Sequence, residues 1–413
     1  MQLLPDVAER ERRELALQMS LGAALITIRG YTDPLVEQTY ARAEALCEQA
    51  GETPALFWVS MGLHLYHTVR GDLPEALQLT NRLETLADRF PELLPNALVA
   101  IGSSHFLAGE FEIAQRELTR AYTLADPDDH AYLIHTGIDL RVLALAFGAL
   151  ALWHLGYPER ARQQARQAIE LADNIKHPHT QVAAYVFAGA ELAHYCGDST
   201  ALCQLARQIV DISDNLGFAH WLLEGYIFLA WGVQFASSGD SSDAAANDPT
   251  DNAADATIDL PRLQSMIDQH GGVANTYFLS MLAQIQLGRK QADRAAQSLT
   301  QGITRIETQG TRFWDAELYR LRGELAVQHN QTDNDHTAAE FAEHCFQQSL
   351  QLAQQQGSRA LALRAALSLG QLWHTQGKTA AAQTLVQRHY EPLTEGFSTP
   401  DLQAAQAFLS IAA

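Results

Sequence analysis

Apolar residues recur along this chain at the three- and four-residue spacing of amphipathic α-helices. They form stretches of about 12–18 residues, separated by short breaks at glycine, aspartate and proline. The alternating runs of valine, isoleucine and threonine that indicate strands do not occur. The pattern therefore predicts an all-α protein.

A five-residue offset between a glycine and an alanine repeats along the chain. It joins Gly71 to Ala76, Gly109 to Ala114, Gly156 to Ala161, and Gly377 to Ala382. In two of these units another glycine, Gly102 or Gly370, precedes the turn glycine at a position where two antiparallel helices would cross. After the alanine, small or bulky apolar residues follow four and then three positions later, which places them on one helix face. The pattern predicts helix pairs with a glycine at each turn.

In this register the chain divides into about nine helix pairs and a final helix, all within a single domain spanning residues 1–413. The final helix, at about 399–411, would cap the apolar face of the last pair. The pairs are expected at about 10–50, 54–90, 93–126, 131–174, 178–215, 218–270, 272–309, 312–356 and 358–391.

Two polar segments interrupt the helical pattern. Residues 237–259 are rich in aspartate, serine and alanine and contain no basic residue, which predicts a disordered acidic insertion within the sixth pair. Residues 329–337 are a shorter polar segment, expected to lengthen the turn of the eighth pair. Neither segment is expected to be a domain boundary.

The glycine and alanine positions resemble the tetratricopeptide repeat (TPR), a helix-turn-helix unit of about 34 residues. The turn glycines of this chain lie farther apart than in the standard repeat. Four longer stretches resemble the TPR-like C-terminal region of large bacterial signalling ATPases of the AAA and STAND types. They are LLPDVAERERRELALQMSLGAAL near the start, FWDAELYRLRGEL at 313–325, LRAALSLGQLW at 363–373 and EGFSTPDLQAAQAFL at 395–409.

The resemblance implies a right-handed α-α superhelix that acts as a sensor or protein-interaction region. In such ATPases this region follows the NTPase and an output module such as a nucleotide cyclase, a kinase or a transcriptional regulator. Its partner would be a protein or peptide, or the NTPase or output domain itself. Two alternatives stay open: a stand-alone TPR scaffold that recruits a peptide or protein, and a small-molecule receptor like that of maltose-type activators.

The same resemblance indicates which side chains face the concave groove, because in the repeat family the first helix of each pair lines it. Aromatic and arginine side chains are the usual anchors of recognition surfaces. The aromatic residues fit a helix core equally well, and salt bridges with Glu317 or Glu324 would equally explain the two arginines. The predicted groove residues are Asn96, Phe106, Trp153, His154, Phe187, Glu191, His194, Tyr195, Tyr226, Asn275, Glu317, Arg320, Glu324, Arg364, Gln371 and His374.

Charge and composition limit the classes of molecule that this chain is expected to bind. The 413 residues include 28 Lys and Arg against 48 Asp and Glu, a formal net charge of −20, which disfavours nucleic acid and anionic membrane surfaces. No apolar run approaches the ~18 residues that cross a bilayer. The scattered cysteines indicate a reducing compartment, so we expect a cytoplasmic protein. They are Cys47, Cys196, Cys203 and Cys345.

Motifs that would carry chemistry are absent or incomplete. Gly377-Lys378-Thr379 ends like a phosphate-binding loop, but six residues separate Gly377 from Gly370 where the loop needs four, and a helix precedes it. The histidines of HLYH at 64–67 and HPH at 177–179 have no accompanying cysteine or carboxylate cluster at zinc-site spacing. No GxSxG motif occurs. We therefore expect no enzyme activity, no cofactor and no metal site.

Overall fold

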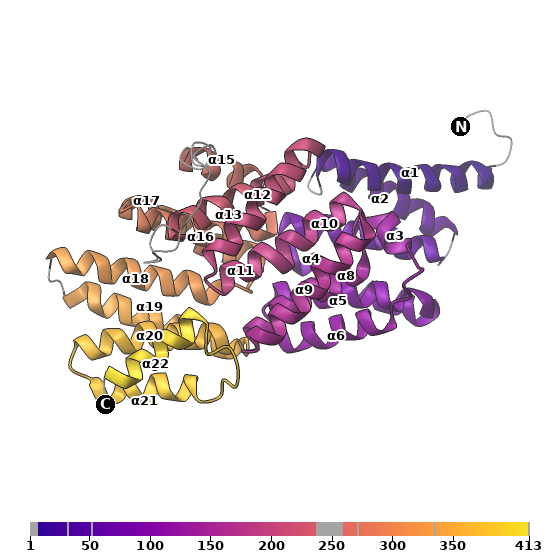
Figure 1. Ribbon diagram of the computed structural model, residues 1–413. Coiled ribbons are helices and arrows are strands. Elements are labelled where there is room, and N and C mark those ends of the chain that lie inside the picture. The colour runs from indigo at the N-terminus through magenta and orange to yellow at the C-terminus, as the bar shows by residue number, and fades with distance from the viewer. Residues whose placement is uncertain are drawn as a thin grey trace.

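The computed structural model describes residues 7–30, 33–50, 53–236, 259–270, 272–333 and 336–411. Within these ranges every regular element is a helix, and the helices stack pairwise into an elongated superhelix (Figure 1). The all-α prediction is therefore confirmed. The predicted acidic insertion at 237–259 lies, except for its last residue, outside the described residues.

The predicted helix pairs appear in order along the described chain. The terminal helix, α22 (Pro400–Ile411), packs on the last pair as predicted. A short helix that the pattern did not separate, α7 (Ala131–Thr136), precedes the fourth pair. The pairs are α1 (Val7–Arg29) with α2 (Pro34–Ala50), α3 (Pro54–Arg70) with α4 (Leu73–Arg89), α5 (Leu94–Leu107) with α6 (Phe111–Leu124), α8 (Leu140–His154) with α9 (Pro158–Ile175), α10 (Pro178–Ala184) through α11 (Leu192–Tyr195) with α12 (Ser199–Leu216), α13 (Ala219–Ala236) with α15 (Leu260–His270), α16 (Asn275–Gly288) with α17 (Ala292–Gln309), α18 (Asp315–Asp333) with α19 (His336–Gln355), and α20 (Arg359–Thr375) with α21 (Thr379–Tyr390).

Glycines have the two roles that their spacing predicts. Gly109 and Gly377 end first helices with φ of 78° and 79°, a left-handed conformation that glycine adopts without steric cost. Gly102 lies where α5 crosses α6, and a Cβ there would come within 2.6 Å of Leu118 Cγ. The same close approach, 2.7 Å to Val386 Cγ2, occurs at Gly370. These glycines therefore set both the turn and the tight spacing within a pair.

Two local features differ from the expectation. The described residues of the polar segment 329–337 are helical, because α18 continues to Asp333 and α19 begins at His336. The segment lengthens both helices instead. The first helix of the fifth pair contains a π-helical segment, η2 (Tyr185–Glu191), between α10 and α11. The three- and four-residue spacing of apolar residues in the sequence does not predict this wider turn.

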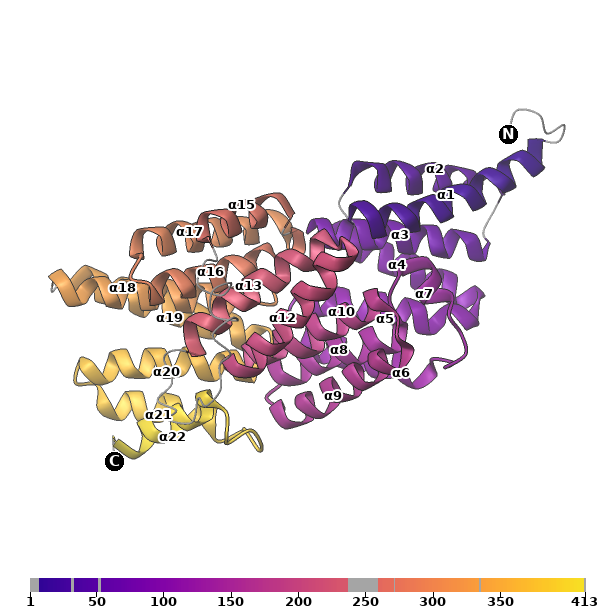
Figure 2. The same ribbon diagram turned by 45° about the horizontal axis from the view of Figure 1, so that its top comes forward.

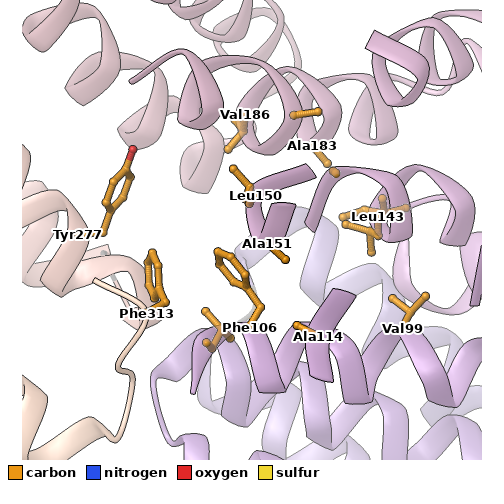
Figure 3. Close-up of a cluster of buried hydrophobic side chains, with 14 of the residues drawn as sticks. Val99, Phe106, Ala114, Leu143, Leu150, Ala151, Ala183, Val186, Tyr277 and Phe313 are labelled. Carbon is orange, nitrogen blue, oxygen red and sulfur yellow. The ribbon is translucent and has the colours of Figure 1, made fainter. Parts of the chain in front are cut away.

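The late pairs of the superhelix return to contact the early ones (Figure 2). The backbone N–H groups of Arg312 and Phe313 donate to the carbonyl oxygen of Leu107 at 2.8 and 3.2 Å. Farther along, the Glu395 carboxylate accepts hydrogen bonds from the first N–H groups of α9. Figure 3 shows Phe106 and Phe313 side by side in the buried cluster, with ring centroids 5.4 Å apart. The inner faces of distant pairs therefore share one core.

Candidate functional site

Five aromatic side chains from four distant segments form the centre of this core. Tyr195 stacks on Trp314 with ring centroids 4.5 Å apart, and Trp153 lies 4.8 Å from Tyr195. The Trp314 indole N–H donates to Ser280 Oγ. We call this set the aromatic core; its members are Trp153, His154, Tyr195, Tyr277 and Trp314, all buried. Three predicted groove residues, Trp153, His154 and Tyr195, thus lie beneath the inner surface.

A polar groove of about 310 Å³ lies beside the aromatic core, toward the C-terminal end of the described chain. Helices α11, α13, α16, α18 and α20 form it, and α22 contributes one side chain. Six of the predicted groove residues come together here. The polar groove is lined by His194, Gly197, Trp231, Gln284, Glu317, Arg320, Glu324, Arg364, Leu367, Ser368, Gln371 and Asp401.

Arg320 forms the central ion pair of the polar groove. Its Nε and Nη2 atoms donate to the two oxygens of Glu317 at 2.8 and 2.6 Å, and its Nη1 atom also pairs with Glu324. Burial alone would raise the pKa of Glu317, but the charge and hydrogen bonds of Arg320 outweigh it and lower the pKa to about 2. The alternative of internal salt bridges is therefore confirmed for Arg320, and the pair is ionised.

Arg364 connects the polar groove to the terminal helix. Its Nε atom donates to Asp401 Oδ2 at 2.8 Å, and Nη2 donates to the Tyr195 carbonyl oxygen at 2.6 Å. The guanidinium lies over the Trp153 ring, 4.9 Å from its centroid. The salt bridge to Asp401 is not one of the pairs that the sequence suggested, because α22 packs here only in the folded chain.

The side of the polar groove that α11, α13 and α16 form carries neutral hydrogen-bonding groups. His194 Nδ1 lies 2.8 Å from the Tyr277 hydroxyl, and burial together with the charge of Arg364 lowers the His194 pKa to about 3. The Trp231 indole N–H donates to Gln284 Oε1 at 2.7 Å. Gln371 is exposed at the rim. The groove therefore offers fixed charges of both signs beside neutral donors and acceptors.

A second hollow, the apolar cavity, borders the aromatic core at Tyr277 and has a volume of about 120 Å³. The predicted groove residues Phe106, Phe187 and Glu191 line it, together with His64 and Glu224. It shares no lining residue with the polar groove. Side chains from α3, α5, α8, η2, α13 and α16 surround it. The resemblance to the repeat family implied one groove, whereas the predicted groove residues of the described chain are divided between the polar groove, the aromatic core and the apolar cavity.

The four remaining predicted residues lie outside both hollows. Asn96 lines a surface pocket at the start of α5. Tyr226 is half-buried in α13, and Asn275 is buried at the start of α16. His374 is exposed near the end of α20, with its ring 5.9 Å from that of Phe408. Their binding role stays a prediction.

Several residues of these sites were missed by the repeat register. Trp314 and Asp401 lie in turns or at helix starts, where the register assigns no inward position. Tyr277 lies on α16, for which only Asn275 was chosen. Glu224 had a usable signal, since it is the only charged side chain in the otherwise apolar helix α13. A lone carboxyl within an apolar helix indicates a buried acid.

The histidine motifs and the Gly-Lys-Thr motif occupy structural positions in the fold. His64 Nε2 lies 2.8 Å from Ser104 Oγ, and His179 Nδ1 lies 3.1 Å from the Gly137 carbonyl oxygen. Lys378 occupies the turn that precedes α21. Among the residues that the structure describes, no group of three or more histidine, cysteine, aspartate or glutamate side chains could hold a metal ion.

The cysteines lie in the protein interior as free thiols. All four cysteines are buried and unbridged, and Cys196 and Cys203 fall on either side of a turn. None of the helices in the described ranges is both long and apolar enough to cross a membrane.

The fold of this chain is similar to that of a solved structure. No family model and no curated protein sequence matches this chain. A solved structure of a Rap protein complexed with Competence and Sporulation Factor is 13% identical, covers 97% of this chain and 100% of that chain, and has a TM-score of 0.58.

Two further solved structures are more distant. The Rap conjugation gene regulator of plasmid pLS20, in complex with the Phr* peptide, is 9% identical over 96% of each chain, with a TM-score of 0.49. A STAND protein with a tetratricopeptide repeat sensor from Pyrococcus horikoshii is 12% identical, over 93% of this chain and 50% of that chain, with a TM-score of 0.34. The likeness to the first Rap protein shows the fold: this chain is a TPR-like superhelix.

Proposed function

We propose that this protein is a non-catalytic scaffold that binds an extended peptide segment in the polar groove. The observation that carries the proposal is the groove itself, which presents acidic side chains, guanidinium groups and amides at the inner surface of a helix-pair superhelix. A peptide backbone offers donors and acceptors in alternation, so it matches a wall that has both. The Rap protein of the same fold is described in a complex with Competence and Sporulation Factor, which supports ligand binding as a function that this fold can have.

The residues of the groove would divide into fixed and contacting groups. Arg320 is held by both oxygens of Glu317, so it stabilises the wall. Glu324, with a side chain 37% exposed, and Gln371 are accessible and would contact the peptide. Arg364 is held flat on Trp153, and a peptide carboxylate would compete with Asp401 for its guanidinium.

A random heptapeptide library displayed on phage and selected on the immobilised protein tests this proposal. Selected peptides are synthesised with a fluorophore and titrated against the wild type, Arg364→Gln and the exposed variant Gln371→Ala. Arg42→Gln, which removes an ion pair with Glu14 far from the groove, is the matched control.

We expect each groove variant to weaken binding at least tenfold and the control to bind like the wild type. The proposal is wrong if no peptide is enriched, or if the enriched peptides bind all four proteins equally.

Membership of a larger signal-transduction ATPase, linked to a cyclase or a regulator, stays a prediction. An immunoblot of source cells with an antibody against this region would test it. A band far above 45.4 kDa supports an attached NTPase and output module. A band at 45.4 kDa would favour the stand-alone scaffold and would contradict the attached arrangement.

A further inference from the structure

We propose that the apolar cavity is a separate binding site for a small organic cation, an ammonium group on a compact apolar body, with Glu191 and Glu224 as its counter-charges. This site is separate from the polar groove, and its ligand is independent of the proposed peptide, because the two hollows share no lining residue. Size, lining and charge each support this class of ligand.

The volume limits the ligand to a small molecule. At about 120 Å³ the cavity is close to the ~150 Å³ of an engineered apolar cavity that binds benzene. A ligand of roughly six to eight non-hydrogen atoms therefore fits. Most of the lining is apolar, so the body of the ligand would also be apolar.

Aromatic rings make the lining suitable for a cation. They come from early, middle and late pairs and are brought together by the closure of the superhelix. The electron-rich face of an aromatic ring attracts an ammonium group, most strongly where water is excluded. The rings that argue for this are Phe106, Phe187, Trp221, Phe228, Tyr277 and Phe313.

Two carboxyl groups lie in this lining without a strong base beside them. Glu191 and Glu224 are only 6% and 4% exposed, and the described residues that line the cavity include no lysine or arginine. Glu191 accepts a 2.5 Å hydrogen bond from the Tyr195 hydroxyl, and Glu224 Oε1 lies 3.3 Å from His220 Nε2. An ammonium ion would supply the positive charge that a buried carboxylate needs.

The pKa values agree with this description of the carboxyls. Burial raises the pKa of Glu191 to about 8. Burial and the charge of Glu191 raise the pKa of Glu224 well above its ordinary value, so Glu191 acts electrostatically on Glu224. A ligand that carries one positive charge would relieve both effects.

His64 provides an independent indication of a hydrogen-bonding ligand. The side chain lines the cavity and is 1% exposed, and its Nε2 atom lies 2.8 Å from Ser104 Oγ. Its Nδ1 atom is buried and has no hydrogen-bond partner among the described residues. A buried polar atom of this kind costs about 1–3 kcal/mol, which a ligand N–H group can recover. Burial lowers the pKa of His64 to about 4, so a neutral ring faces the ligand.

The π-helical segment explains how the fifth pair reaches the cavity. Phe187 and Glu191 both lie in η2 and both line the cavity, one with a ring and the other with a carboxyl. Single π-turns within α-helices occur frequently at functional sites. Here the wider turn directs a pair of side chains suited to a cation toward one hollow.

Isothermal titration with benzylamine and benzyl alcohol tests the inference. The two probes have the same size and apolar ring, and differ in that only benzylamine is charged at about pH 8. The proteins are the wild type, Glu191→Gln, Glu224→Gln and the control Glu84→Gln, whose side chain is exposed on α4. Circular dichroism confirms that each variant is folded before it is titrated.

We expect benzylamine to bind the wild type at least tenfold more tightly than benzyl alcohol does. Each cavity variant should lose at least tenfold in benzylamine affinity, keep its affinity for benzyl alcohol, and bind the selected peptides like the wild type. Equal binding of the two probes, or binding of neither, would overturn the inference. Loss of peptide binding in the groove variants alone bears only on the proposed function.

Discussion

Replacing Glu191 with glutamine should make the protein more stable at neutral pH. Glu191 is buried, and its carboxyl accepts a hydrogen bond from Tyr195 that an amide oxygen can also accept. Glutamine has nearly the same volume and does not ionise. The variant therefore removes the cost of keeping an acid protonated inside the core, with little change in packing.

The magnitude follows from the difference in pKa between the two states. Burial raises the pKa of Glu191 from 4.5 to about 8 in the folded protein. Because the folded pKa is the higher one, the contribution of this group to stability is present below pH 4.5 and is lost as the pH rises toward 8. At about pH 7.5 the loss amounts to about 4 kcal/mol, at about 1.4 kcal/mol per pH unit.

Urea unfolding followed by tryptophan fluorescence at about pH 5 and about pH 7.5 measures the effect. Glu191→Gln should have nearly the wild-type midpoint at the lower pH and a clearly higher midpoint at the upper pH. Glu84→Gln, an exposed position, should follow the wild type at both. If Glu191→Gln were less stable than the wild type at about pH 7.5, or had the same pH dependence, the account of a buried neutral carboxyl would be refuted.

Three further substitutions test the packing, each by the shift of the urea midpoint. Arg320→Met leaves Glu317 buried without its partner and should lower the free energy of unfolding by about 3–5 kcal/mol. The double variant that also carries Glu317→Leu should recover most of this loss. A loss of under about 1 kcal/mol in the single variant would contradict the ion-pair geometry. Gly102→Ala should cost about 1–3 kcal/mol, because its Cβ would meet Leu118 at 2.6 Å; an unchanged midpoint would mean that α5 and α6 cross less closely. Glu395→Ala removes the acceptor for the first N–H groups of α9 and should cost about 1 kcal/mol, and a neutral result would count against the contact between distant pairs.

The helix pairs could be predicted from sequence because local physics determines them. The offset from Gly109 to Ala114 combines a left-handed helix end with a small residue on the inner face of the next helix, and both are consequences of nearby residues. The crossing glycine Gly102 follows from the same spacing. Helix α22 was also predictable, since an apolar face at the end of an array needs a cover.

The two hollows could not be predicted, because they depend on contacts between residues far apart in the sequence. His154 reaches Ser358 with a 3.0 Å hydrogen bond, and Arg364 reaches Asp401 on the terminal helix. Repeat spacing indicates that Trp153 faces inward, but only the closure of the superhelix determines that it is buried. The π-helical turn that contains Glu191 also lacks a spacing signal, whereas Glu224 could have been identified as the only charged side chain of α13.

Photo-cross-linking tests the central claim, a peptide on the inner surface, most directly. A selected heptapeptide with one benzophenone side chain is irradiated with the protein, and the cross-linked residues are identified by mass spectrometry. We predict cross-links on α18 and α20, near Glu324 and Gln371, that unlabelled peptide competes away. Specific cross-links confined to the second helices of the pairs, such as α17, α19 and α21, would contradict the account.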